Sequence, residues 1–254
     1  MATVTRSNRT RSKAAKVASP LPSLESGDHL SGAEYDRIYA ALPGVRAELI
    51  EGVVYVSSPV SLVHGNPHSD LSVWAGMYRI FTPGVASPTD STVELDPDNR
   101  PQPDIQLFIS PNHGGRTGET EIGSYVLGAP ELVIEIAVSS ASKDLHSKKR
   151  SYRRNEVWEY VVWRVLDDRI DWFVLRDGRY GRLKPTPEGL FKSERFPGLW
   201  LDEAAALDGD MVTVLRVLQE GLASPEHAAF VAKLAAEAAR IAEIAPAPPQ
   251  DPQP

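Results

Sequence analysis

The stretch that decides the fold is Pro130-Glu131-Leu132-Val133-Ile134-Glu135-Ile136-Ala137-Val138, followed by Lys143-Asp144-Leu145-His146-Ser147-Lys148-Lys149. The first segment is rich in β-branched residues and almost continuously apolar, which is typical of a strand that is covered on both faces. Glu135 interrupts this run, and a buried carboxylate without a partner is destabilising. Glu135 therefore needs a partner, either a metal ion, a hydrogen-bond network, or a lysine of the helix predicted to follow.

A second carboxylate lies upstream, where Asp104 follows a proline near the beginning of an extended segment over residues 102–109. If the two segments are neighbouring strands, Asp104 and Glu135 lie within a few ångströms of each other. Two carboxylates and a backbone carbonyl form an oxygen-rich site that suits Mg²⁺ or Mn²⁺ and not zinc. With a lysine from the following helix, such a site is equipped for metal-assisted hydrolysis of a phosphodiester.

Further upstream, residues 47–57 predict two short strands joined by a tight turn, with Glu48 in the first strand. His64 and His68 follow, ahead of an apolar stripe with helical spacing. Pro67 lies between the histidines and is suited to the first position of a helix. We therefore do not expect both histidines inside one regular helix, and a structural zinc site is disfavoured.

Two segments around the stretch offer further cations. Residues 110–129 predict a long mobile loop, in which His113 and Arg116 are candidates for a phosphate contact, although a solvated loop is the simpler interpretation. Residues 143–155 predict a helix with a basic face, which is usually solvated. Its place beside the carboxylates makes phosphate contact a second interpretation. The basic side chains of this helix are Lys143, Lys148, Lys149, Arg150, Arg153 and Arg154.

The order of predicted elements indicates a mixed α/β sheet domain, because three further strands follow the basic helix. We expect four regions along the chain. They are a disordered basic tail over residues 1–28, the α/β domain over 29–202, a helical extension over 203–244 with helices at 203–221 and 225–244, and a disordered proline-rich tail over 245–254.

The composition of the chain excludes several classes of protein. The chain has 254 residues, 42% of them hydrophobic, which is enough for a sizeable core. Its net charge of −7 argues against a protein coated in basic surface, but not against a nuclease whose acidic centre is neutralised by metal. The absence of cysteine excludes disulfides, thiolate zinc sites and cysteine nucleophiles. No apolar run reaches the roughly 18 residues of a membrane span, so we expect a soluble, cytoplasmic protein.

Several groups of residues, in this order along the chain, resemble the motifs of the Uma2 family. They are Glu48-Leu-Ile-Glu-Gly52, Ser58-Pro59 with a following histidine, Pro103-Asp104, Ala129-Pro130-Glu131-Leu132-Val133-Ile134-Glu135, and the series Asp144, Lys148, Tyr152, Val157-x-Glu159-Tyr160. The resemblance covers residues 45–202. It implies the restriction-endonuclease-like fold of the PD-(D/E)xK nuclease superfamily, which is a mixed β-sheet core flanked by helices. It also implies Mg²⁺-dependent (or Mn²⁺-dependent) endonuclease cleavage of DNA.

The resemblance also implies roles for individual residues. Asp104 and Glu135 match the family's metal-binding carboxylates, and Glu48 matches the acidic residue of its first motif. Lys148 matches the catalytic lysine, which in this family lies on the helix and not two residues after the glutamate. That strand position is Ala137 here, so the literal Glu-x-Lys motif is absent.

Two further points concern neighbours of these residues. Asp144, Lys148 and Tyr152, at four-residue intervals, are expected to share one helix face, which is consistent with a lysine positioned by its neighbours. The resemblance thus points to Lys148, and not to Lys143 or Lys149, as the site lysine. His64 fits the spacing of the family histidine slightly better than His68, and both stay candidates.

Three functional hypotheses stay open. The first is the metal-dependent endonuclease. The second is a non-catalytic nucleic-acid-binding or assembly module that retains the nuclease fold, and the third is a buried ion-pair network without activity. Because double-strand cutting by this fold commonly needs two active sites, the first hypothesis is compatible with a homodimer. Leu199, Trp200 and the C-terminal helices are its candidate contacts.

Overall fold

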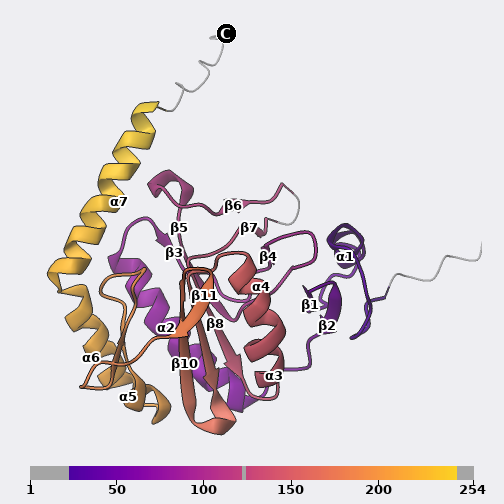
Figure 1. The fold of residues 1–254 in the computed structure, drawn as a ribbon, viewed down its shortest axis with the longest axis horizontal. Helices are drawn as coiled ribbons and strands as arrows, with labels where there is room; N and C mark the ends of the chain where they lie inside the picture. Colours follow the sequence, from indigo (N-terminus) through magenta and orange to yellow (C-terminus); the bar gives the residue numbers. More distant parts are fainter. Residues whose placement is uncertain (1–22, 122–123, 245–254) are drawn as a thin grey trace, which may run out of the picture.

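The centre of the molecule is a mixed six-stranded β-sheet, seen in the computed structural model, which describes residues 23–121 and 124–244 (Figure 1). The strand order is β11-β10-β9-β8-β5-β3, and the pairing of β8 with β9 is parallel while the others are antiparallel. The strands are β3 (Val85–Ala86), β5 (Ile105–Ile109), β8 (Leu132–Ala137), β9 (Glu159–Arg164), β10 (Arg169–Arg176) and β11 (Arg179–Arg182). The predicted mixed α/β sheet is therefore confirmed.

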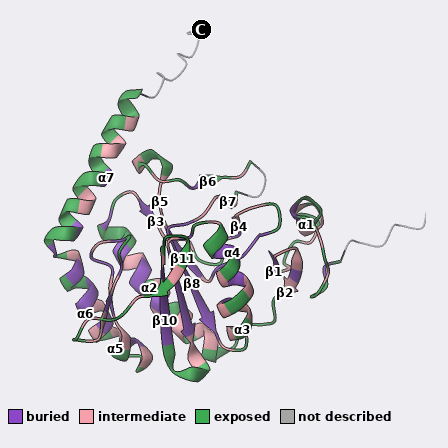
Figure 2. Cartoon of the chain, viewed as in Figure 1, coloured by how far each residue is buried: buried purple, intermediate pink, exposed green. Residues whose placement is uncertain are grey.

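Strand β8 is one of the two central strands of this sheet, and all of its residues are buried (Figure 2). Its side chains alternate between two hydrophobic clusters, as the two-residue period of a strand requires. Leu132, Ile134 and Ile136 pack in the cluster that contains helix α2 (Leu62–Phe81). Val133 packs in the cluster on the opposite face. The nearly continuous apolar run in the sequence reflects this covering on both sides.

Helix α2 begins at Leu62, ahead of Pro67, so both candidate histidines lie in one helix. The prediction that Pro67 starts the helix is wrong. Proline at this position removes one helical hydrogen bond. Despite this lost hydrogen bond, the helix is held against the sheet by its buried stripe of Leu71, Trp74 and Tyr78.

The helix that follows β8 is not regular. It consists of α3 (Ala141–Lys143), a π-helical turn η2 (Asp144–Lys148) and α4 (Lys149–Arg154). π-helical turns are rare in proteins, and those that do occur are often found at functional sites. Tyr152 of α4 packs in the same cluster as Val133, so this segment covers the face of the sheet opposite α2.

The predicted hairpin is present as β1 (Ala47–Ile50) and β2 (Val53–Val56), beside helix α1 (Gly32–Tyr39) (Figure 1). Both turn residues, Glu51 and Gly52, have positive φ angles of 53° and 76°, as a two-residue hairpin turn requires. Leu24 packs against this hairpin, although the sequence assigned it to the basic tail. Residues 26–28 of the predicted tail also bond to β2, so the tail prediction is wrong for this part, while residues 1–22 lie outside the described residues.

Residues 110–129 are more structured than predicted. They include the short helix η1 (Pro111–His113) and the strands β6 (Gly118–Glu119) and β7 (Val126–Leu127). These strands join β4 (Val93–Glu94) in a three-stranded sheet. The prediction of one long loop is therefore wrong. Two-residue strands are too short to show a periodic pattern in the sequence.

The C-terminal part packs on the same core. Its elements are β12 (Leu190–Lys192), β13 (Trp200–Asp202), α5 (Glu203–Leu207), α6 (Met211–Leu222) and α7 (Pro225–Ile244). The single helix predicted over 203–221 is wrong, because Gly209, with φ 72°, separates α5 from α6. Leu199, a candidate dimer contact, is fully buried in the core and is not a surface residue.

The outer face of α7 is largely exposed (Figure 2). Within the described residues, no helix is long and apolar enough to cross a membrane. The proline-rich tail predicted over 245–254 lies outside the described residues.

Candidate active site

The two candidate metal ligands lie opposite each other in the sheet. β5 and β8 pair antiparallel with Ile105 opposite Ile134. The same register places Asp104, one residue before β5, opposite Glu135. The backbone N–H of Ile136 donates to Oδ2 of Asp104 at 2.6 Å, which fixes that carboxylate at the edge of β8. The neighbourhood predicted for Asp104 and Glu135 is therefore confirmed.

Glu135 is held through one of its two carboxylate oxygens. Oε1 accepts hydrogen bonds from Nζ of Lys148 at 2.9 Å and from the hydroxyl of Tyr152 at 2.8 Å. Within the described residues, no group donates to Oε2. Burial raises the pKa of Glu135 well above its usual value, and the neighbouring Asp144 and Asp104 raise it further, against the lowering effect of Lys148.

Lys148 is enclosed by carboxylates. Its Nζ lies 2.6 Å from Oε1 of Glu48, 2.9 Å from Oε1 of Glu135 and 4.0 Å from Oδ1 of Asp144. The side chain is 3% exposed. Burial favours the neutral amine, but Glu135 and Glu48 outweigh it and raise the pKa of Lys148 well above its usual value. Lys148 is therefore a link between the hairpin and β8 whose charged form is favoured by both carboxylates.

Glu48 joins two lysines. Its Oε2 accepts a hydrogen bond from Nζ of Lys143 at 2.7 Å, while its Oε1 contacts Lys148 and accepts from the backbone N–H of Gln102 at 2.9 Å. Burial would raise the pKa of Glu48, but Lys148 and Lys143 lower it to about 2. The sequence favoured Lys148 over Lys143 as the site lysine, and the structure brings both lysines to Glu48.

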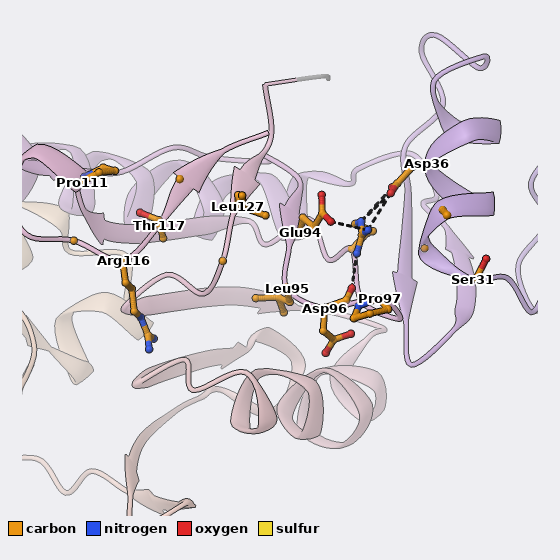
Figure 3. Close-up of a pocket in the computed structure, with 16 residues that line it drawn as sticks. Ser31, Asp36, Glu94, Leu95, Asp96, Pro97, Pro111, Arg116, Thr117 and Leu127 are labelled. Atoms are coloured by element: carbon orange, nitrogen blue, oxygen red, sulfur yellow. Dashed lines mark hydrogen bonds and ion pairs between the residues drawn. The ribbon is translucent and has the colours of Figure 1, made fainter. Parts of the chain in front are cut away.

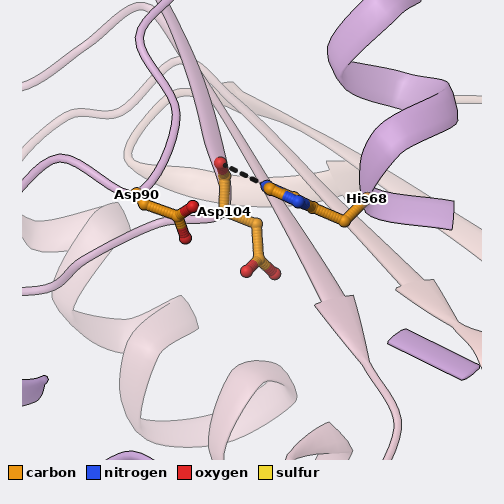
Figure 4. A group of neighbouring side chains, drawn as sticks. All are labelled: His68, Asp90 and Asp104. Atoms are coloured by element: carbon orange, nitrogen blue, oxygen red, sulfur yellow. Dashed lines mark hydrogen bonds between the residues drawn. The ribbon is translucent and has the colours of Figure 1, made fainter. Parts of the chain in front are cut away.

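Both histidines of α2 approach Asp104. Nε2 of His64 lies 3.3 Å from Oδ1 of Asp104, and Nε2 of His68 lies 3.1 Å from its backbone carbonyl oxygen (Figure 4). The hydrogen bond with Asp104 raises the pKa of His64. Burial works to raise the pKa of Asp104, but the hydrogen bonds from His64 and from the backbone N–H of Ile136 lower it below its usual value.

Asp90 is a site residue that the sequence reasoning missed. One carboxylate oxygen of Asp90, one of Asp104 and a ring nitrogen of His68 lie within 4.8 Å of one another (Figure 4). Asp90 has a positive φ of 53° and forms an ion pair with Arg46. It lies in a loop without regular periodicity or a motif, so no signal in the single sequence identifies it.

A cavity of about 490 Å³ opens over these groups. Its walls come from the hairpin, the beginning of α2, the end of β8 and the segment from α3 to η2. The predicted site residues all line it, namely Glu48, His64, Asp104, Glu135 and Lys148. Five positions scattered over the sequence thus form one concave, polar site.

The ligand set of this cavity fits a divalent cation. Four carboxylates, those of Glu48, Asp104, Glu135 and Asp144, surround two ammonium groups, those of Lys143 and Lys148. With all six groups ionised, two negative charges stay uncompensated. Oδ1 of Asp144 is buried and has no hydrogen-bond partner among the described residues. A divalent cation between oxygen ligands would balance this charge.

The remaining basic side chains of the helix are occupied elsewhere. Arg150 and Arg154 form ion pairs with Glu51, and Arg153 donates to the backbone carbonyl of Gly178. Nζ of Lys149 lies 3.3 Å from the ring centroid of Phe173. The predicted basic face is therefore not a free surface for phosphate, because hairpin and sheet contacts bind most of its charges.

A second cavity, of about 870 Å³, lies between α1 and the β4-β7-β6 sheet (Figure 3). Its buried Arg100 is paired with Asp36 and Glu94. Arg116, a predicted phosphate contact, donates to the backbone carbonyl of Ala129 and stacks 4.1 Å from the Trp158 ring. Neither Arg116 nor His113 lines the carboxylate cavity.

Asp104 directly before β5, Glu135 on the adjacent β8 and Lys148 from the segment after β8 form the arrangement expected of a restriction-endonuclease-like protein. The sequence model of the Uma2 family, described as "Putative restriction endonuclease", matches residues 33–204. The chain belongs to the Uma2 family, which makes it a nuclease-like protein of the hydrolase class.

The fold has a relative among solved structures. A crystal structure described as "a putative nuclease belonging to DUF820" from Anabaena variabilis superposes with a TM-score of 0.51 at 17% sequence identity. The match covers 68% of this chain and 96% of that chain, and it shows a shared fold. A search of curated proteins found no match.

Proposed function

We propose that this chain is a Mg²⁺- or Mn²⁺-dependent endonuclease that hydrolyses phosphodiester bonds of DNA. The observation that carries the proposal is the opposed pair of Asp104 and Glu135 at a cavity with an excess of negative charge. Oxygen ligands with surplus charge suit a hard divalent cation. The Uma2 match supports the reaction class.

Asp104 and Glu135 are the proposed metal ligands, through Oδ1 of Asp104 and Oε2 of Glu135. When bound, the cation would polarise the phosphoryl group and lower the pKa of a water molecule. Lys148 and Tyr152 hold Glu135 through its other oxygen, and among the described residues no group donates to Oε2, which would be the oxygen that holds the metal. Lys148 is thus a positioning residue, because its charge is already shared between Glu135 and Glu48.

The chemical step is a hydrolysis. The oxygen of a water molecule bonds to phosphorus while one P–O ester bond breaks, and the electron pair of that bond leaves with the ester oxygen. The water gives up a proton to solvent, and the leaving oxygen takes one up. His64 and Glu48 support this step indirectly, since His64 contacts Asp104 and Glu48 contacts Lys148.

The test is cleavage of supercoiled plasmid DNA by purified protein with Mg²⁺, with Mn²⁺ and with EDTA. We expect nicking with either metal and none with EDTA. Asp104→Asn and Glu135→Gln should each abolish it. Glu243→Gln changes an exposed carboxylate on α7 and serves as the matched control, with activity equal to the wild type.

Parallel incubations with single-stranded RNA of matched length separate DNA from RNA as the substrate. Preferential cleavage of RNA would overturn the DNA assignment. Activity that survives Asp104→Asn, or a wild-type protein that cleaves neither substrate and binds no metal, would favour the non-catalytic module.

A further inference from the structure

The two lysines on Glu48 differ in what their ammonium groups can still reach. Nζ of Lys148 faces three carboxylates within 4.0 Å, so all of its charge is directed at protein groups. An ammonium has three N–H donors. Nζ of Lys143 makes one hydrogen bond, to Oε2 of Glu48, and the described residues provide no acceptor for its other two donors.

Lys143 is also accessible from the cavity. Its side chain is 23% exposed, against 3% for Lys148, and it lines the cavity together with Asp104 and Glu135. Its ammonium lies 5.1 Å from the ring centroid of Tyr55, which confines it over the hairpin. The ammonium group of Lys143 is therefore held in place by Glu48 and Tyr55, and two of its N–H groups stay available to a ligand in the cavity.

The π-helical turn explains how both lysines reach one carboxylate. In a regular α-helix, with 3.6 residues per turn, residues five apart point about 140° away from each other. The hydrogen bonds of a π turn run from residue i to i+5, which brings residues at that spacing toward one face. Lys143 precedes η2 directly and Lys148 ends it, and each contacts one oxygen of Glu48.

We propose that Lys143, and not Lys148, is the lysine that donates to a non-bridging oxygen of the scissile phosphate. This inference rests on the proposed function and names the substrate contact of the same site. The phosphate brings negative charge to a cavity already rich in carboxylates, so a cation with free donors beside the metal ligands is needed to receive it. The added charge of the transition state strengthens that contact, which makes Lys143 a catalytic residue.

The test compares Lys143→Met, Lys143→Arg and the control Lys149→Met on a DNA duplex. Lys149 belongs to the same helical segment but packs over Phe173, outside the cavity. We expect Lys143→Met to lose about 10²-fold in kcat/KM, mainly in kcat. Lys143→Arg should recover part of the loss, and Lys149→Met should match the wild type.

A second readout is the salt dependence of DNA binding with Ca²⁺ in place of Mg²⁺. Loss of one phosphate contact should reduce the slope of log K against log salt concentration by about 1 in Lys143→Met. If Lys143 acted only by positioning Glu48, the slope would not change, and that result overturns the proposal. So does a kcat/KM within about threefold of the wild type.

These outcomes are distinguishable from failure of the proposed function. If the wild-type protein cleaves no DNA with any metal, the endonuclease proposal fails. The binding slope then decides alone whether Lys143 contacts a phosphate.

Discussion

Nζ of Lys148 lies 2.9 Å from Oε1 of Glu135 and thereby ties the π-helical turn to the central strand. The same nitrogen lies 2.6 Å from Glu48 on the hairpin, so one buried ammonium joins three parts of the fold. The geometry of the candidate metal ligand Glu135 therefore depends on a lysine whose own side chain is only 3% exposed.

The first prediction concerns stability. Lys148→Met removes the only ammonium that contacts Glu135 among the described residues, and it leaves buried carboxylates without a counter-charge. We expect a loss of about 3–5 kcal/mol in the free energy of unfolding, measured by urea denaturation. Lys184→Met, an exposed lysine outside the site, should change it by less than about 0.5 kcal/mol. Unchanged or raised stability in Lys148→Met would favour the inactive ion-pair network.

The second prediction concerns metal affinity and pH. Because the pKa of Glu135 is raised above its usual 4.5, a proton competes with the cation for this carboxylate as the pH falls toward that value. We expect Mn²⁺ affinity, measured by calorimetry, to increase with pH above 4.5, with release of protons. Glu135→Gln should abolish most of the binding. An affinity that does not vary with pH would contradict the role of Glu135 as a ligand.

The third prediction concerns the stability of the metal-free protein. A carboxyl group whose pKa is higher in the folded state binds more protons there than in the unfolded chain, so it destabilises the fold as the pH rises from 4.5 through the folded pKa. With EDTA present, the wild type should lose stability over this range more steeply than Glu135→Gln. Saturating Mn²⁺ should reduce the difference. Parallel curves for the two proteins in EDTA would exclude this linkage.

The fourth prediction concerns the contact between the sheet and the C-terminal helices. A Cβ at Gly221 of α6 would lie 2.2 Å from the carbonyl oxygen of Gly198 and 2.9 Å from the Trp200 ring. Gly221→Ala should destabilise the protein by about 1–3 kcal/mol, measured by thermal unfolding. Metal affinity at the remote cavity should stay unchanged. Unchanged thermal stability of Gly221→Ala would contradict the prediction, because it would show that α6 can move away from Gly198 and Trp200 without a loss of stability.

The sequence was sufficient for the parts of the site that lie on regular elements. The apolar run around Glu135 and the proline before Asp104 predict two strands, and the antiparallel register brings their carboxylates together. Strand periodicity and short connections suffice for such inferences. They also indicated that a lysine of the segment after β8 could reach back to Glu135, but the choice of Lys148 among these lysines came from the resemblance to the family motif.

The remaining errors have local physical causes. Lys148 was chosen over Lys143 because it matches the family motif, and the contact of Lys143 with Glu48 was not foreseen because a π turn is not visible in a sequence pattern. The basic face of α4 was misinterpreted because the hairpin supplies Glu51, a turn residue, as the partner of two arginines. Pro67 was expected to begin α2, but tertiary packing of the apolar stripe extends that helix past it.

The most direct test of the central claim is anomalous diffraction from a crystal soaked with Mn²⁺. The proposed function predicts a peak between Asp104 and Glu135, at about 2.2 Å from one carboxylate oxygen of each. It also predicts that Glu135→Gln crystals lack this peak. An absent peak at saturating Mn²⁺, or a peak confined to His68 and Asp90 away from Glu135, would contradict the claim.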